Sequence, residues 1–166
     1  KNQPPLGFAG HEPVPAAKYL SRAIVLHRGM GAWSGLAESL TTHPKGRVVR
    51  NLADLLAGAE SQQMEVSITT SVTDVVSYTL ATPARDMVAF WEEGVAGARA
   101  IPASLTSLVT ATLTLTTDIE SPAKVFIVDP LNGVRQEAVV AQEETDGPLT
   151  LPGLILADYP LIIQVS

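Results

Sequence analysis

KVFIVDPLNGVRQEAV (residues 124–139) and LILADYPLIIQVS (residues 154–166) are the two stretches that decide the fold of this chain. In the first, an apolar run stops at Asp129-Pro130, and Asn132-Gly133 then favours the positive φ of a tight turn. In the second, Asp158-Tyr159-Pro160 separates two apolar runs. Short apolar runs bounded by turn residues are typical of β-strands. We therefore expect the second stretch to end in the last strand of an antiparallel β-sandwich.

The same strand pattern extends back along the chain to residue 61. Residues 109–116 alternate apolar side chains with threonine, which predicts a strand with one buried face and one hydroxyl face toward water. Residues 76–81 and 86–91 flank a short polar connection, an arrangement typical of a hairpin. With the remaining apolar runs the count reaches about seven to eight strands at regular spacing, which indicates a sandwich.

Residues 1–60 carry helical signals instead. Pro15 suits the first turn of a helix, and a second helix is expected after Pro44. The residues that recur at helical spacing in the first helix are Ala16, Leu20, Ala23 and His27, with Ala17 and Ile24 beside them. Those in the second helix are Val49, Leu52 and Leu56, with Leu55 beside them. We therefore predict an α+β chain that is mainly β, with a helical segment over residues 1–60 and an antiparallel β-sandwich domain over residues 61–166.

Composition excludes several classes of function. The chain has 166 residues and no cysteine, so it has neither disulfides nor cysteine-ligated metal. Its net charge of −6 gives no basic footprint for nucleic acid. No apolar run approaches the roughly 20 residues that span a bilayer. Lys1-Asn2-Gln3-Pro4-Pro5 is not a signal peptide, so we expect the chain to start at a mature terminus or inside a larger protein.

Few side chains suggest chemistry. His11, His27 and His43 fit no metal-ligand spacing, and we expect no metal or other cofactor. Glu92 and Glu93 are adjacent on a strand end and point to opposite faces, so they could not flank one glycosidic bond. We therefore assign no catalytic residue. Trp33 and Trp91 are the candidates for a ring surface on which a sugar could stack.

Several segments, taken in order, resemble the C-terminal region of a clan-A type (β/α)8-barrel glycoside hydrolase. PAAKYLSRAIVLHRGMG (residues 15–31) and GLAESLTTHPKGRVVRNLADLLAGA (residues 35–59) resemble the last barrel helices. MVAFWEE (residues 87–93) and the two stretches quoted first are similar to strands of the β-sandwich that follows the barrel. The link between Gly31 and Gly35 departs from the family pattern, because it is too short to hold the eighth barrel strand.

The resemblance implies a non-catalytic portion of a secreted or cell-envelope enzyme of carbohydrate degradation. Its role would be structural support of the barrel, and its partner would be a catalytic barrel domain or a partner chain, with polysaccharide as a further ligand. The family's catalytic carboxylates would precede Lys1, so none is carried over and we expect no hydrolysis by this chain. The alternative is a non-enzymatic module for carbohydrate binding or surface assembly. Exposed rings at Trp33 and Trp91 would favour that alternative, and buried rings would favour the structural role.

Overall fold

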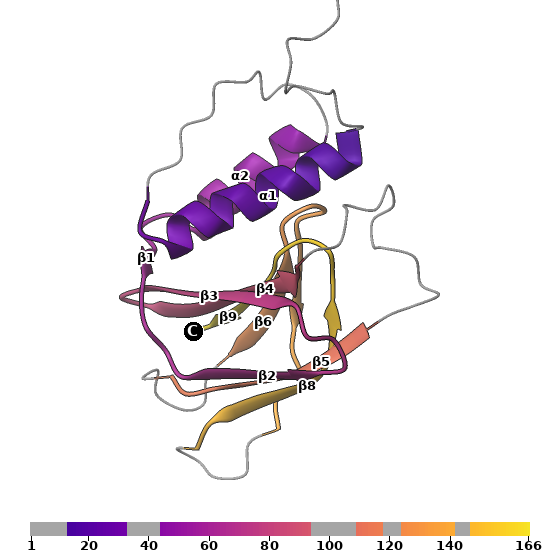
Figure 1. The fold of residues 1–166 in the computed structure, drawn as a ribbon. Coiled ribbons are helices and arrows are strands. Elements are labelled where there is room, and N and C mark those ends of the chain that lie inside the picture. Colours follow the sequence, from indigo (N-terminus) through magenta and orange to yellow (C-terminus); the bar gives the residue numbers. More distant parts are fainter. Residues whose placement is uncertain (1–12, 33–43, 94–108, 118–123, 142–146) are drawn as a thin grey trace, which may run out of the picture.

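The computed structural model describes residues 13–32, 44–93, 109–117, 124–141 and 147–166. In this part of the chain, Figure 1 shows three layers: a pair of helices, a six-stranded sheet below them, and a three-stranded sheet on the far side of the larger sheet. All strand pairs are antiparallel. The predicted fold, an α+β sandwich that is mainly β with two N-terminal helices, is confirmed.

The helices are α1 (Pro13–Gly29) and α2 (Lys45–Leu55). The strands are β1 (Glu60–Ser61), β2 (Val66–Thr70), β3 (Val75–Thr82), β4 (Arg85–Glu92), β5 (Val109–Leu115), β6 (Val125–Asp129), β7 (Val134–Glu137), β8 (Leu149–Leu156) and β9 (Leu161–Val165). The larger sheet has the order β1-β3-β4-β9-β6-β7, and the smaller one has the order β2-β5-β8. The division of the chain at residue 60 into a helical segment and a sandwich domain stays a prediction. Buried residues of the helices and of the strands belong to one hydrophobic cluster.

Period-two sequence patterns are reproduced where one face of a strand meets solvent. In β5 the residues Ala111, Leu113 and Leu115 are buried, and the threonines between them are not. β3 and β4 form the predicted hairpin. In β8, Gly153 has φ +70° at the point where the register against β5 shifts, so an extra residue is accommodated as a bulge.

β9 is the last strand in the sequence, but it lies in the middle of the six-stranded sheet between β4 and β6. All five of its residues are buried, including Gln164. Both faces of this strand are covered, one by the helical layer and the other by the smaller sheet (Figure 1). This explains why LIIQV shows no alternation of apolar and polar residues, since neither face meets water.

The buried side of α1 differs from the prediction. The helix begins at Pro13, so Pro15 lies in its first turn as expected, and its buried residues are Ala17, Lys18, Ser21 and Val25. The expected face (Ala16, Leu20, Ala23 and His27) is only half-buried, and its His27 is exposed. Of the two residues expected beside that face, Ala17 is buried and Ile24 is half-buried. The predicted centre of the face was wrong because the prediction followed apolar spacing alone, whereas the side that packs inward carries a lysine and a serine. In α2, Leu52 and Leu56 are buried as expected, but Val48 replaces Val49 on that face.

Gly29 allows the end of α1 to approach β3 closely. A Cβ at this position would lie 2.2, 2.4 and 2.7 Å from three atoms of the Tyr78 side chain. We expect Gly29→Ala to lower the free energy of unfolding by about 1–3 kcal/mol through overpacking, despite the higher helix propensity of alanine. Urea unfolding measures the loss. The same substitution in a Tyr78→Ala background should cost little, and an equal cost in both backgrounds would contradict this account.

Candidate functional site

A buried ion pair joins α1 to the loop between β8 and β9. The Nζ atom of Lys18 lies 2.8 Å from Oδ1 and 3.1 Å from Oδ2 of Asp158, 140 residues away in the sequence. Their side chains are 0% and 2% exposed. Lys18 Nζ also lies 5.3 Å from the centroid of the Tyr159 ring, within reach of a cation–π contact. A buried charge requires such partners, because desolvating it alone is costly.

The next turn of α1 adds one hydrogen bond within the helix and one to the same loop. The hydroxyl of Ser21 donates to the carbonyl oxygen of Lys18 at 2.7 Å, which satisfies this buried polar side chain. The guanidinium of Arg22 donates through Nη2 to the carbonyl oxygen of Asp158. Two cations of α1, Lys18 and Arg22, therefore hold the β8–β9 loop, the first through the carboxylate of Asp158 and the second through its backbone.

Tyr159 carries the connection onward to the turn between β6 and β7. Its hydroxyl donates to Oδ2 of Asp129 at 3.0 Å. The other oxygen of Asp129, Oδ1, accepts from the backbone N–H of Leu131 at 2.8 Å, and Oδ2 accepts from Nδ2 of Asn132 at 2.7 Å. Asp129 thus acts as an Asx cap of its own turn while it also holds the phenol.

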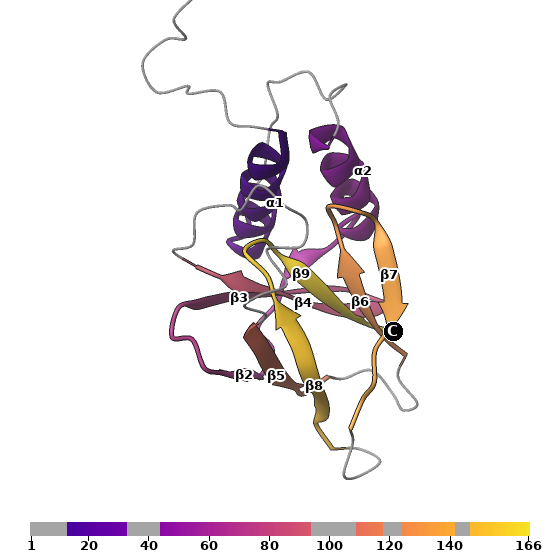
Figure 2. The same ribbon diagram turned by 90° about the vertical axis from the view of Figure 1, so that its right-hand side faces the viewer.

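The second helix reaches this turn as well. Nδ2 of Asn51 donates to the carbonyl oxygen of Pro130 at 2.8 Å. Figure 2 shows the tip of the β6–β7 hairpin beside α2, and the loop that precedes β9 on the side of α1. Lys18, Asp158, Tyr159, Asp129, Asn132 and Asn51 form a set that we call the polar network. It ties both helices to two loops of the six-stranded sheet.

Burial and the two nearby carboxylates fix the protonation state of Tyr159. Its pKa is raised far above the ordinary value of 10.0, chiefly by burial, then by the charge of Asp129 and the hydrogen bond to it, and then by the charge of Asp158. The phenol therefore stays neutral and acts as a hydrogen-bond donor.

This shift predicts a loss of stability in alkali. Above pH 10 the phenol releases its proton in the unfolded chain but keeps it in the folded chain. The free energy of unfolding should therefore fall, with a contribution from this one proton of about 1.4 kcal/mol per pH unit. Urea unfolding between neutral pH and pH values above 10 measures the slope. Tyr159→Phe should remove this contribution, and an unchanged slope in that variant would rule out the assignment.

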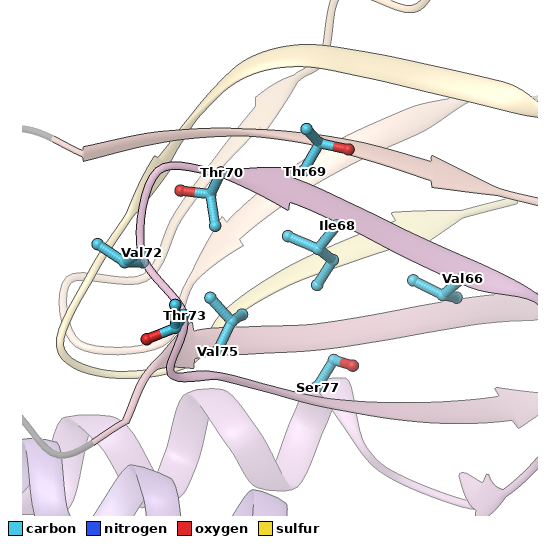
Figure 3. Close-up of a pocket in the computed structure, with 8 residues that line it drawn as sticks. All are labelled: Val66, Ile68, Thr69, Thr70, Val72, Thr73, Val75 and Ser77. Atoms are coloured by element: carbon cyan, nitrogen blue, oxygen red, sulfur yellow. The ribbon is translucent and has the colours of Figure 1, made fainter.

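A groove opens where the edges of the two sheets separate, between β2 and β3 (Figure 3). It has a volume of about 430 Å³. Its lining consists of β-branched residues and one serine, namely Val66, Ile68, Thr69, Thr70, Val72, Thr73, Val75 and Ser77. These side chains offer methyl groups and hydroxyls but no titratable group. The groove therefore has no acid, base or ring with which to process or stack a sugar.

A second hollow, of about 490 Å³, lies where the residues after α2 meet the β3–β4 turn. Its lining includes Gly58, Gln62 and Pro83, and Glu60 is its one titratable residue. A single carboxylate does not provide the pair that glycoside hydrolysis uses. Neither hollow is lined by a residue of the polar network.

Of the two tryptophans that the sequence suggested for sugar stacking, the structure describes Trp91 alone. Trp91 is 4% exposed, and its ring stacks on that of Tyr78 with centroids 5.8 Å apart. A ring in this position presents no face to a sugar in solution. Trp33 lies outside the described residues. Glu92 closes β4, and Glu93 follows it at an exposed position.

Comparison with solved structures identifies a similar fold. The crystal structure of a cycloisomaltooligosaccharide glucanotransferase from Paenibacillus sp., complexed with cycloisomaltoheptaose, matches with a TM-score of 0.51 and 11% sequence identity. The fold is shared. The match covers 92% of this chain and 27% of that enzyme, so this chain spans little more than a quarter of its length. No protein-family model and no curated protein sequence matches the chain.

Other kinds of site find no support in the described part of the chain. Among these residues, no three His, Asp or Glu side chains gather as metal ligands would. No helix within the described ranges is long and apolar enough to cross a membrane.

Sequence reasoning missed the polar network. A signal that could have suggested part of it is the Asp-Tyr-Pro tripeptide before β9.

Proposed function

We propose that this chain is a non-catalytic part of a carbohydrate-active enzyme of the glycoside hydrolase type, where it supports the catalytic barrel. The observation that carries the proposal is the fold match, which covers 92% of this chain and so extends over helices and sandwich together. A match confined to the sandwich would have fitted any β-sandwich module. Because the helices and the sandwich share their arrangement with the glucanotransferase, the match supports the proposal that this chain is a piece of a larger enzyme.

The polar network, together with the hydrogen bond from Arg22, supports a structural role for the helices. Lys18 and Arg22 of α1 and Asn51 of α2 hold the loops of the six-stranded sheet, so the helical layer is fixed in orientation by contacts at several points. In the proposed enzyme these helices would belong to the outer ring of the barrel. A fixed helix pair would then transmit the position of the sandwich directly to the barrel.

A sugar-binding module has less support. Trp91, which the sequence suggested as a ring for sugar stacking, is buried. The groove between β2 and β3 has no aromatic side chain in its lining. Recognition of sugars by stacking depends on exposed rings at the binding surface. The described residues therefore favour the structural role over the carbohydrate-binding alternative.

The proposal is tested with the complete reading frame that encodes these residues. We expect it to encode a (β/α)8 barrel before residue 1, with hydrolase or transferase activity on glucans. Activity and solubility of the complete product should be lost when residues 13–166 are deleted. The purified 166-residue chain should release no sugar from isomalto-oligosaccharides. A reading frame without a barrel, or turnover by the chain alone, would falsify the proposal.

A further inference from the structure

The turn between β6 and β7 presents a chemically reactive dipeptide at the surface. Asn132 and Gly133 are both exposed, and Gly133 has φ +76°. An asparagine amide can be attacked by the backbone nitrogen of the next residue, and a following glycine hinders this attack least because it lacks a Cβ atom. The sequence alone would thus mark Asn132 as prone to deamidation.

The fold restrains both reacting groups through Asp129. The N–H of Gly133 donates to the carbonyl oxygen of Asp129 at 2.8 Å, so the attacking nitrogen is engaged. Nδ2 of Asn132 donates to Oδ2 of Asp129 at 2.7 Å, and Oδ1 of Asn132 accepts from the N–H of Val134 at 2.7 Å. Attack requires these bonds to open together, so local opening of the turn should control the reaction.

Tyr159 holds the carboxylate that makes this restraint. Its hydroxyl donates to the same Oδ2 atom of Asp129 that accepts from Asn132. Tyr159 is 2% exposed. Water can therefore take over its hydrogen bond to Oδ2 of Asp129 only if the loop opens. The buried phenol therefore restricts the motion of a surface asparagine through one shared oxygen.

We propose that Asn132 is a site of spontaneous deamidation, gated by the bond between Tyr159 and Asp129. The nitrogen of Gly133 loses its proton to a base in solution and attacks Cγ of Asn132. A C–N bond forms, and the side-chain nitrogen leaves as ammonia, which gives a five-membered succinimide. Water then opens this ring at either carbonyl and yields aspartate or isoaspartate at position 132.

The product would loosen the contact of the turn with α2. The modified side chain loses the N–H donor and places a second carboxylate beside that of Asp129, and like charges at this distance repel. The isoaspartate form also lengthens the backbone by one methylene within a tight turn. Because Asn51 of α2 binds the carbonyl of Pro130 in this turn, the modification would weaken one attachment of the helical layer.

The test measures conversion of Asn132 by peptide mapping with mass spectrometry, in the folded chain at mildly alkaline pH. Asn51, which is followed by leucine, serves as the internal reference. We expect slow conversion at Asn132 in the unsubstituted chain, much faster conversion in denaturant, and roughly tenfold faster conversion in folded Tyr159→Phe, which lacks one hydrogen bond to a charged group. Leu113→Ala, in the other sheet, is the control for global destabilisation.

Equal rates in Tyr159→Phe and the unsubstituted chain would overturn the gating, as would an equal acceleration in Leu113→Ala. If Tyr159→Phe does not fold, hydrogen exchange of the Gly133 N–H in the unsubstituted chain decides the question. Strong protection of this amide supports the restraint, and exchange as fast as in an unfolded peptide contradicts it.

Discussion

Replacing Lys18 by methionine is expected to lower the free energy of unfolding by about 3–5 kcal/mol. Methionine retains most of the side-chain volume, so the main effect is the loss of the ammonium that neutralises Asp158. The carboxylate would then remain buried, at 2% exposure, without the ammonium that now lies 2.8 Å from it. Urea unfolding followed by circular dichroism gives the change directly.

Two further variants separate charge from packing. Lys18→Met combined with Asp158→Leu removes both charges of the pair, so we expect the double variant to recover much of the loss. Lys124→Met removes an exposed lysine and should change stability by no more than about 0.5 kcal/mol. If Lys18→Met costs as little as Lys124→Met, the ion pair does not hold the helical layer.

Truncating Trp91 to alanine is expected to cost about 3–5 kcal/mol, the range for removing a large aromatic side chain from a core. The ring is 4% exposed and stacks on Tyr78, so its removal leaves a cavity beside the Tyr78 ring. The loss should appear in thermal and urea unfolding. Trp91→Phe should cost less, because it retains part of the buried surface.

Trp91→Ala also distinguishes the structural role of Trp91 from a sugar-binding role. Titration with isomalto-oligosaccharides should show no affinity that depends on this ring. Val134→Ala, at a position that is 52% exposed, is the matched control and should leave stability nearly unchanged. A variant that remains as stable as the parent but loses sugar binding would show instead that Trp91 reaches the surface.

The strands could be predicted from the sequence where one face meets water. In β5 the threonines alternate with buried leucines, so the period of two was visible. The position of β9 could not be predicted in the same way. LIIQV is apolar on both faces, which indicates cover on both sides but does not say which strands flank it. That information depends on pairing with β4 and β6, which lie far away in the sequence.

The inward face of α1 could not be predicted because its energetics depend on distant residues. Apolar spacing favoured the face of Ala16, Leu20 and Ala23, and no local signal makes a buried lysine favourable. Lys18 is stabilised inside by the carboxylate of Asp158, and these residues are separated by 140 positions. The same reason hid the polar network, whose members come from both helices and two loops.

The central position of β9 has a consequence for synthesis of the protein. The β3–β4 and β6–β7 hairpins are joined within the large sheet only through this strand. Until residues 161–165 have emerged from the ribosome, a nascent chain can therefore form the hairpins that have already emerged but cannot join them. Its apolar sheet faces stay open to chaperones or to other nascent chains until that point. Closing the sheet is thus a late step that depends on contacts between distant residues, and such contacts form slowly.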